Sequence, residues 1–182
     1  YVGGKTPEMW YRIGRLQYHF LVAEGLRPDH RFLDVGCGAL RLGQFLIPYL
    51  DRGHYFGLEA EPSLVAAGLH DELPEALVAQ KAPVFGYGYD FDVGFVPGFD
   101  VAMAQSLFTH LTPDDIAVCL RNLRAVAGAH ARLYFSFFEG DRKNRKGPSH
   151  ARRSWLYQAD TLTQLAAESG WANDYIGDWG HP

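Results

Sequence analysis

The alternation of short apolar runs with helical segments is the feature that most constrains the fold of this 182-residue chain. Short runs rich in Val, Phe, Tyr and Leu indicate buried strands, and segments with apolar residues at helical spacing separate them. This order is typical of an α/β domain in which a mostly parallel sheet carries helices on both faces. The predicted strands are 31–35, 54–58, 82–87, 100–104 and 132–138, with a sixth at 171–176.

Helix signals fill the intervals between these strands. Thr6 and Thr112 are each followed by proline, and Thr caps free amides while Pro suits the first helical position. The predicted helices are 7–24, 40–50, 62–68, 74–80, 113–127 and 161–169. We expect one domain, with an N-terminal helix in residues 1–25 and a doubly wound core in 31–182, and ligands at the carboxyl ends of the strands.

Two glycines follow the first predicted strand, in the run Asp34-Val35-Gly36-Cys37-Gly38. Glycine lets a backbone approach a ligand closely, and the start of the next helix offers free amides. Glu59 ends the second strand, where a carboxylate can accept both hydroxyls of a ribose. These features indicate a site for a ribose-bearing cofactor, although the glycine pair alone would also fit a plain tight turn.

With this motif and this alternation, nearly the whole chain resembles the class I S-adenosylmethionine-dependent methyltransferases. The resemblance implies a Rossmann-like fold, S-adenosylmethionine as cofactor and methyl transfer to a small-molecule acceptor. It also implies which residues bind the cofactor: Asp34, Gly36 and Gly38 its methionine part, Glu59 its ribose, Asp90 and Phe91 its adenine, with Gln105 lining the pocket. Asp92 competes with Asp90 for the adenine role.

Leu40 and Arg41 depart from common patterns. Leu40 stands where the family often has a third glycine, which suggests a different entry into the helix. Arg41 stands where the fingerprint of NAD sites needs glycine or alanine, so a dinucleotide-dependent oxidoreductase is the weaker alternative. A cofactor-binding module without catalysis is a further alternative. Arg41 itself is expected to form a surface salt bridge or to hold the helix start against the loop.

His110 and Glu139 are the candidate catalytic residues. His110 follows the fourth strand, and histidine titrates near neutral pH, which suits a proton acceptor. The alternative is a loop histidine that is hydrogen-bonded to backbone. Glu139 ends the fifth predicted strand on the same side of the sheet. It would bind or deprotonate the acceptor, or be a solvated carboxylate.

A basic cluster follows the fifth strand, in residues 142–146 with Arg152 and Arg153. It would attract an anionic acceptor that carries phosphate or carboxylate, or it would be a solvated loop. Trp10 and Tyr11 would border the same acceptor, because an N-terminal helix commonly covers the cofactor in this family. The net charge of −4 argues against a general nucleic-acid binder.

The cysteine content and the apolar runs bear on disulfides, metal sites and membrane spans. Cys37 and Cys119 are the only cysteines, so we expect free thiols in a cytoplasmic protein and predict no metal site. No apolar run approaches the length of a membrane span. After 171–176 too few residues remain for the final antiparallel strand of the family's sheet. We therefore expect a core without that strand, with an unpaired edge covered by further chain or by a partner.

Overall fold

A computed structural model of the chain describes residues 6–141 and 147–180. Its centre is a parallel sheet of five strands in the order β3-β2-β1-β4-β5. The strands are β1 Phe32–Val35, β2 Tyr55–Glu59, β3 Val84–Tyr87, β4 Phe99–Ala104 and β5 Ala127–Phe135. This confirms the predicted doubly wound α/β fold. The strand order reverses between β1 and β4, and in open sheets of this kind the space outside the carboxyl ends of two such strands is the crevice where ligands bind.

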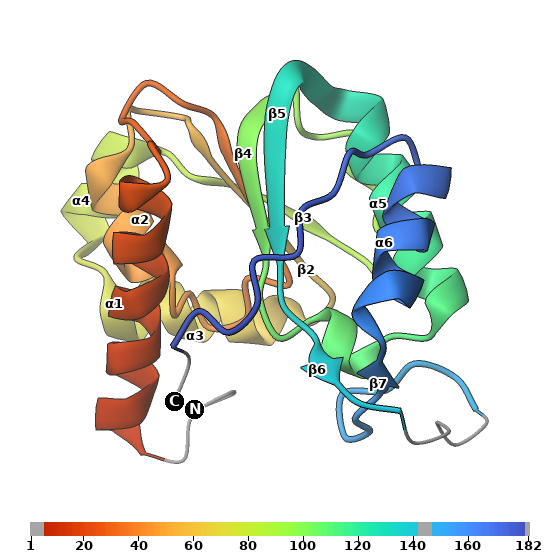
Figure 1. Cartoon of the computed structure of the whole chain (residues 1–182). Helices are drawn as coiled ribbons and strands as arrows, with labels where there is room; N and C mark the ends of the chain where they lie inside the picture. Colours follow the sequence, from red (N-terminus) through yellow and green to blue (C-terminus); the bar gives the residue numbers. More distant parts are fainter. Residues whose placement is uncertain (1–5, 142–146, 181–182) are drawn as a thin grey trace.

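Helices cover both faces of the sheet, as Figure 1 shows. One face carries α1 Pro7–Ala23, α2 Gly43–Tyr49, α3 Pro62–Glu72 and α4 Glu75–Lys81, and the other carries α5 Pro113–Val126 and α6 Ala159–Glu168. Thr6 caps α1 by accepting from the Met9 amide, and Thr112 caps α5 by accepting from the Asp115 amide, as the sequence predicts. No helix among the described residues is long and apolar enough to cross a membrane.

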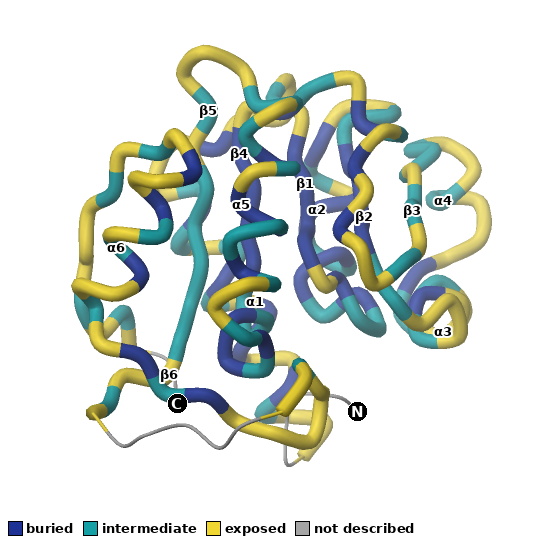
Figure 2. Tube along the Cα trace, turned by 90° about the vertical axis from the view of Figure 1, so that its right-hand side faces the viewer, coloured by how far each residue is buried: buried dark blue, intermediate teal, exposed yellow. Residues whose placement is uncertain are grey.

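The central strands are buried on both faces. In β1, Leu33 and Val35 pack toward α5 and α6, whereas Phe32 packs toward α1 and α2. The neighbouring strands β2 and β4 divide their residues between the same two clusters. Figure 2 shows the buried residues running through this central part of the molecule. Packing on both faces holds the carboxyl end of β1, and the loop that follows it starts from a fixed point.

The helix predicted for 40–50 begins later than expected, at Gly43. Leu40 has a φ of +61°, a value incompatible with a right-handed helix, so residues 38–42 extend the loop instead. The fifth strand begins earlier than predicted, at Ala127, directly after α5. Ala127 pairs with Phe99 and Arg132 pairs with Val101, so the register shifts between these two pairs. The first residues of the strand therefore lack the alternation that predicts a strand.

The strand predicted for 171–176 is wrong. This segment is anchored by side chains and not by a backbone ladder. The indole of Trp171 donates to the Leu120 carbonyl, and the Asn173 amide donates to the Thr163 hydroxyl. Figure 1 shows the segment crossing in front of β5 without joining the sheet. Within the described residues β5 therefore pairs with β4 alone, as the expected edge strand would.

Two short strands lie outside the main sheet. β6 Phe138–Glu139 pairs in parallel with β7 Leu156–Tyr157. Glu139 was expected at the end of the fifth strand, but that strand stops at Phe135 and Glu139 belongs to β6. The loop that connects β6 and β7 reaches the segment after β4, where the Trp155 amide donates to the Thr109 carbonyl.

Helix α1 approaches the loop after β1 very closely at Gly14. A Cβ on Gly14 would lie 2.3 Å from the carbonyl oxygen of Arg41 and 2.9 Å from the ring of Phe45. Glycine therefore allows α1 to lie directly on the segment that links the glycine loop to α2. The N-terminal helix and the loop after β1 are packed as one unit.

The substitution Gly14→Ala is expected to destabilise the fold, although alanine favours a helix over glycine by about 1 kcal/mol. Overpacking against a fixed backbone oxygen costs roughly 1–3 kcal/mol, so we expect a net loss of up to about 2 kcal/mol. Urea unfolding followed by circular dichroism measures this change. Arg12→Ala, on the exposed side of the same helix, is the matched control and should change little. A more stable Gly14→Ala protein would contradict the close packing.

Candidate functional site

The loop after β1 turns on three residues with positive φ. Gly36 has a φ of +73° and Gly38 of +54°, values that glycine adopts without cost. The amides of Gly36 and Cys37 both donate to the Leu58 carbonyl, at 2.8 and 3.1 Å, which ties the loop to the end of β2. A Cβ on Gly38 would meet nothing within 4 Å. The space beside Gly38 is thus open to a ligand, as the sequence motif requires.

Leu40 is the third residue of the loop with positive φ and occupies the position where the family often has glycine. Its φ of +61° is strained for a residue with a Cβ. Its side chain is fully buried in the cluster that also holds Leu46 and Val65. Burial of a leucine side chain contributes about 1.5–3 kcal/mol, which offsets a strain of about 1–2 kcal/mol. The loop therefore keeps the glycine-type turn with leucine in it.

Glu59, at the end of β2, is held beside this loop by three backbone amides. Its Oε2 accepts from Gly38 at 2.8 Å, and its Oε1 accepts from Ala60 at 2.8 Å and Glu61 at 3.1 Å. These bonds fix the carboxylate next to the open space at Gly38. A carboxylate offers about four acceptor positions, so Oε2 retains capacity for a further donor. The structure thus brings Gly36, Gly38 and Glu59 together.

Asp34, near the end of β1, is buried below the loop. Its Oδ2 accepts a hydrogen bond of 2.8 Å from the hydroxyl of Tyr55. Burial raises the pKa of Asp34 to about 7, and the Tyr55 hydrogen bond and the charge of Arg41 oppose that rise. Sequence reasoning missed Tyr55. A tyrosine at the start of a fully buried strand needs a partner for its hydroxyl, and that requirement was the available signal.

Arg41 spans the crevice between β1 and β4. Its Nη2 donates to Oε1 of Gln105, the residue directly after β4. The side chain is half-buried, and it lies close enough to Asp34 for the two charges to interact. Of the two roles expected from the sequence, holding the loop fits this placement better than a surface salt bridge. The predicted pocket residue Gln105 thereby lies next to the glycine loop.

The residues predicted for the adenine lie at the end of β3, beside β2. The Gly88 amide donates to the Glu59 carbonyl at 3.3 Å, which joins the two strand ends. Asp90 is exposed there, whereas Phe91 is buried in the hydrophobic core with its φ at +56°. The Asn122 side chain donates to the carbonyl of each. Asp90 thus follows the strand end that is joined to Glu59, while the Phe91 side chain packs into the core.

His110 ends a short 3-10 helix, Phe108–His110, after β4. Its Nδ1 lies 2.7 Å from the Arg153 carbonyl oxygen. Because a carbonyl only accepts, Nδ1 carries the proton in this pair, and in the neutral ring Nε2 has the lone pair. The backbone hydrogen bond is the structural alternative anticipated from the sequence. It also orients the ring in the tautomer that can accept a proton at Nε2.

Glu139 is exposed in β6 and bound to the C-terminal segment. Its Oε2 accepts a hydrogen bond of 2.7 Å from the Tyr175 hydroxyl. This hydrogen bond raises the pKa of Tyr175. Glu139 is separate from the glycine loop, and the structure does not bring it together with Asp34 or Glu59.

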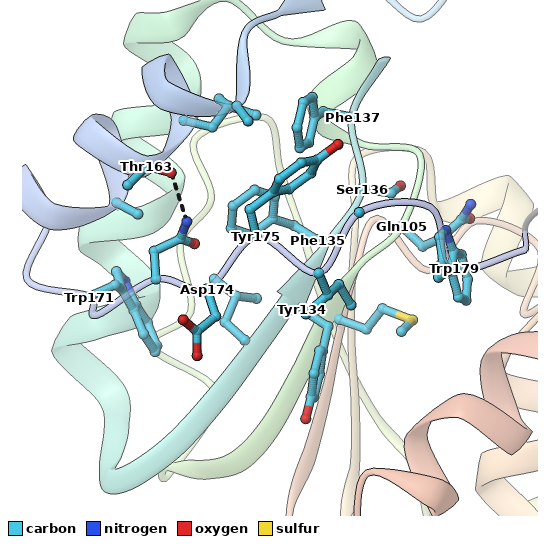
Figure 3. A pocket seen from close by; sticks show the side chains of 18 of the residues that line it. Gln105, Tyr134, Phe135, Ser136, Phe137, Thr163, Trp171, Asp174, Tyr175 and Trp179 are labelled. Atoms are coloured by element: carbon cyan, nitrogen blue, oxygen red, sulfur yellow. Dashed lines mark hydrogen bonds between the residues drawn. The ribbon is translucent and has the colours of Figure 1, made fainter. Parts of the chain in front are cut away.

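A cavity of about 720 Å³ lies between β5, α6 and the C-terminal segment (Figure 3). Several aromatic side chains line it, among them Tyr134, Phe135, Phe137, Tyr175 and Trp179. Gln105 and Glu139 are the two predicted site residues that line it. Gln105 therefore faces both the cavity and Arg41, and it connects the crevice above β1 with the larger space beside β5.

The remaining described candidates for the acceptor side belong to α1 and to the segment that precedes β7. Residues 142–146 of the basic cluster lie outside the described residues, and Arg152 and Arg153 are exposed. Trp10 is buried on the inner side of α1. Tyr11 is 47% exposed, and its ring packs 5.1 Å from that of Phe45.

Comparison with known proteins gives the class of fold. No family model matches the sequence. Among solved structures, the magnesium protoporphyrin IX methyltransferase of Synechocystis PCC 6803 with bound S-adenosylmethionine has a TM-score of 0.66 and 18% identity, covering 92% of this chain and 74% of that one. The glycopeptide N-methyltransferase MtfA has a TM-score of 0.65 and 14% identity, covering 86% and 82%. An S-adenosylmethionine-dependent methyltransferase of Clostridium acetobutylicum ATCC 824 has a TM-score of 0.59 and 11% identity, covering 95% and 89%.

The chain therefore has the Rossmann-like fold of the class I S-adenosylmethionine-dependent methyltransferases. At this level the resemblance inferred from the glycine motif and Glu59 is confirmed. Sequence identities below 25% support a shared fold and no more. The chemistry of this chain must therefore be argued from its own residues.

The raised pKa of Asp34 predicts a pH dependence of stability. The folded protein binds this proton more tightly than the unfolded chain, whose carboxyl has the ordinary value of 3.8. As the pH rises from about 4 to about 7, deprotonation therefore destabilises the fold, by at most about 1.4 kcal/mol per pH unit. Asp34→Asn removes this contribution. We expect the free energy of unfolding of the variant, minus that of the parent, to increase between pH 5 and pH 7 when both are measured by urea titration.

Tyr55→Phe is the matched test of the cause. It deletes the hydrogen bond that lowers the pKa of Asp34, so the pH range of the effect should shift upward. Parallel stability profiles for the parent and Asp34→Asn over this range would contradict a raised pKa.

Proposed function

We propose that this chain binds S-adenosylmethionine and transfers its methyl group to a small-molecule acceptor. The observation that carries the proposal is the hydrogen bond between Glu59 and the amide of Gly38. It joins a carboxylate suited to ribose with an open glycine loop, at the carboxyl ends of two adjacent strands. The solved structures of the same fold, two of them with S-adenosylmethionine bound, support the same assignment.

Each part of the cofactor would have its own residues. Asp34, Gly36 and Gly38 would hold the methionine part, and Glu59 the ribose. Asp90 and Phe91 would lie at the adenine, with the buried Phe91 contributing through its backbone. Gln105 would line the pocket beside the transferable methyl group. The Arg41–Gln105 hydrogen bond crosses the place where an NAD fingerprint needs a small residue, which disfavours the dinucleotide alternative.

The residues of the chain would align the acceptor with the methyl group of the cofactor and would remove a proton from the acceptor. The cofactor would supply an electrophilic methyl group, and alignment of two reactants can contribute up to about 7–11 kcal/mol. We propose that the acceptor approaches from Gln105 and the adjoining aromatic cavity. His110, whose Nδ1–H donates to the Arg153 carbonyl, would take the acceptor's proton at Nε2. Glu139 would bind the acceptor from the far side of that cavity.

The charge of the acceptor is a finer part of the proposal. An anionic group would find cations in the basic cluster, of which Arg152 and Arg153 are described and exposed. Exposed charges of this kind attract an anion through solvent and are screened by salt within about 10 Å at 0.1 M. The α1 helix, packed on residue 41, would cover the cofactor from its other side.

Calorimetric titration with S-adenosylhomocysteine and with NAD tests the proposed cofactor. We expect binding of S-adenosylhomocysteine and none of NAD. Tight NAD binding without S-adenosylhomocysteine binding would overturn the proposal. Binding without methyl transfer to any acceptor in a metabolite screen would favour the non-catalytic module.

The substitution Glu59→Ala tests the ribose contact. Loss of charge-assisted hydrogen bonds worth about 1.5–3 kcal/mol each should raise the dissociation constant of S-adenosylhomocysteine by about 100-fold. Glu61→Ala is the matched control, because Glu61 is an exposed carboxylate two residues further on that bonds to Tyr89. An unchanged dissociation constant for Glu59→Ala would show that Glu59 is not at the ribose.

A further inference from the structure

We propose that Arg41 binds the carboxylate of the cofactor's methionine part, an inference that rests on the proposed function. The first reason is position. Arg41 follows the strained turn at Leu40 and precedes α2, so its side chain starts from the mouth of the glycine loop. From there the guanidinium extends across the crevice and donates to Gln105, at the end of β4. It thus lies over the place where the methionine part would meet the loop.

The second reason is charge. Burial lowers the pKa of Arg41 and the nearby Asp34 opposes that change, but a guanidinium stays protonated at neutral pH. The charged groups that act on Asp34 are Arg41 and Glu59. Among the described residues, Glu59 is thus the negative and Arg41 the positive charge beside Asp34. An amino-acid carboxylate entering the crevice would be repelled by Glu59, and Arg41 is suited to receive it.

The third reason is geometry. A guanidinium has five N–H donors in a planar fork, which matches a carboxylate through two parallel hydrogen bonds. Gln105 takes one donor and orients the plane. The backbone of Arg41 is itself fixed, since its carbonyl accepts from the Gln44 side chain at 3.1 Å and lies against Gly14 of α1. An arginine held at both ends binds with little loss of conformational freedom.

This role would make Arg41 the reason for the departure from the glycine-rich pattern. In an NAD site the same position must be small so that a pyrophosphate can approach the helix. A carboxylate is smaller than a pyrophosphate and can be met by a side chain from the loop. The arginine would therefore select for a cofactor that ends in an amino acid.

Two ligands that differ only in the carboxylate test the assignment. These are S-adenosylhomocysteine and its decarboxylated analogue, S-(5′-adenosyl)-3-thiopropylamine. We expect the parent protein to prefer the first by about 10- to 100-fold, from charge-assisted hydrogen bonds. In Arg41→Met, which keeps an apolar stem without the charge, this preference should fall close to unity. Arg41→Lys should retain part of it, because the charge remains but the fork is lost.

Arg52→Met is the matched control. Arg52 donates to the carbonyls of Ala79 and Gln80, away from the crevice, and the preference should be that of the parent. An unchanged preference in Arg41→Met would overturn the assignment, whether or not both ligands bind more weakly. If both were weakened equally, Arg41 would only hold the loop. If the parent bound neither ligand, the proposed function itself would fail, and this assignment with it.

Discussion

The burial of β1 on both faces is the constraint on which the rest of this structure depends. Alternate residues of a four-residue strand enter two hydrophobic clusters, so the strand can neither slide nor turn without opening both. Its carboxyl end is therefore a fixed origin for the glycine loop. Glu59 stands beside that loop because β2 pairs with β1 in parallel and ends at the same edge. Gln105 reaches it from β4 for the same reason.

The parts of the fold that sequence could predict are those fixed by local rules. The central strands are apolar runs bounded by turn residues, and their predicted limits agree with β1, β2 and β4 to within a residue. The helices that start at Pro7 and Pro113 carry caps that act through hydrogen bonds three residues away. Asp34, Gly36, Gly38 and Glu59 could be placed together because parallel strands put their carboxyl ends at one edge.

The errors arose where distant contacts override local preference. From the local sequence Leu40 is predicted to be helical. Burial of its side chain instead stabilises a left-handed backbone conformation, and α2 starts only at Gly43. The run at 171–176 looks like a strand, yet the side chains of Trp171 and Asn173 anchor it to helices. The sequence also gives no sign that the ring of Phe91, which is predicted to lie at the adenine, packs in the core. Neither Tyr55 nor the reach of Arg41 to Gln105 is visible until the strands are paired.

The buried turn at Leu40 links the shape of the glycine loop to the condition of the hydrophobic core. Its left-handed backbone is maintained by a side chain packed among residues of α2 and α3. A change in that packing would allow the turn to relax and would carry the Gly38 amide with it. The shape of the glycine loop and the packing of the interior are thus coupled through one residue. A substitution in the core around Leu40 would therefore act on the loop as well, whereas with glycine at the same position the two would be independent.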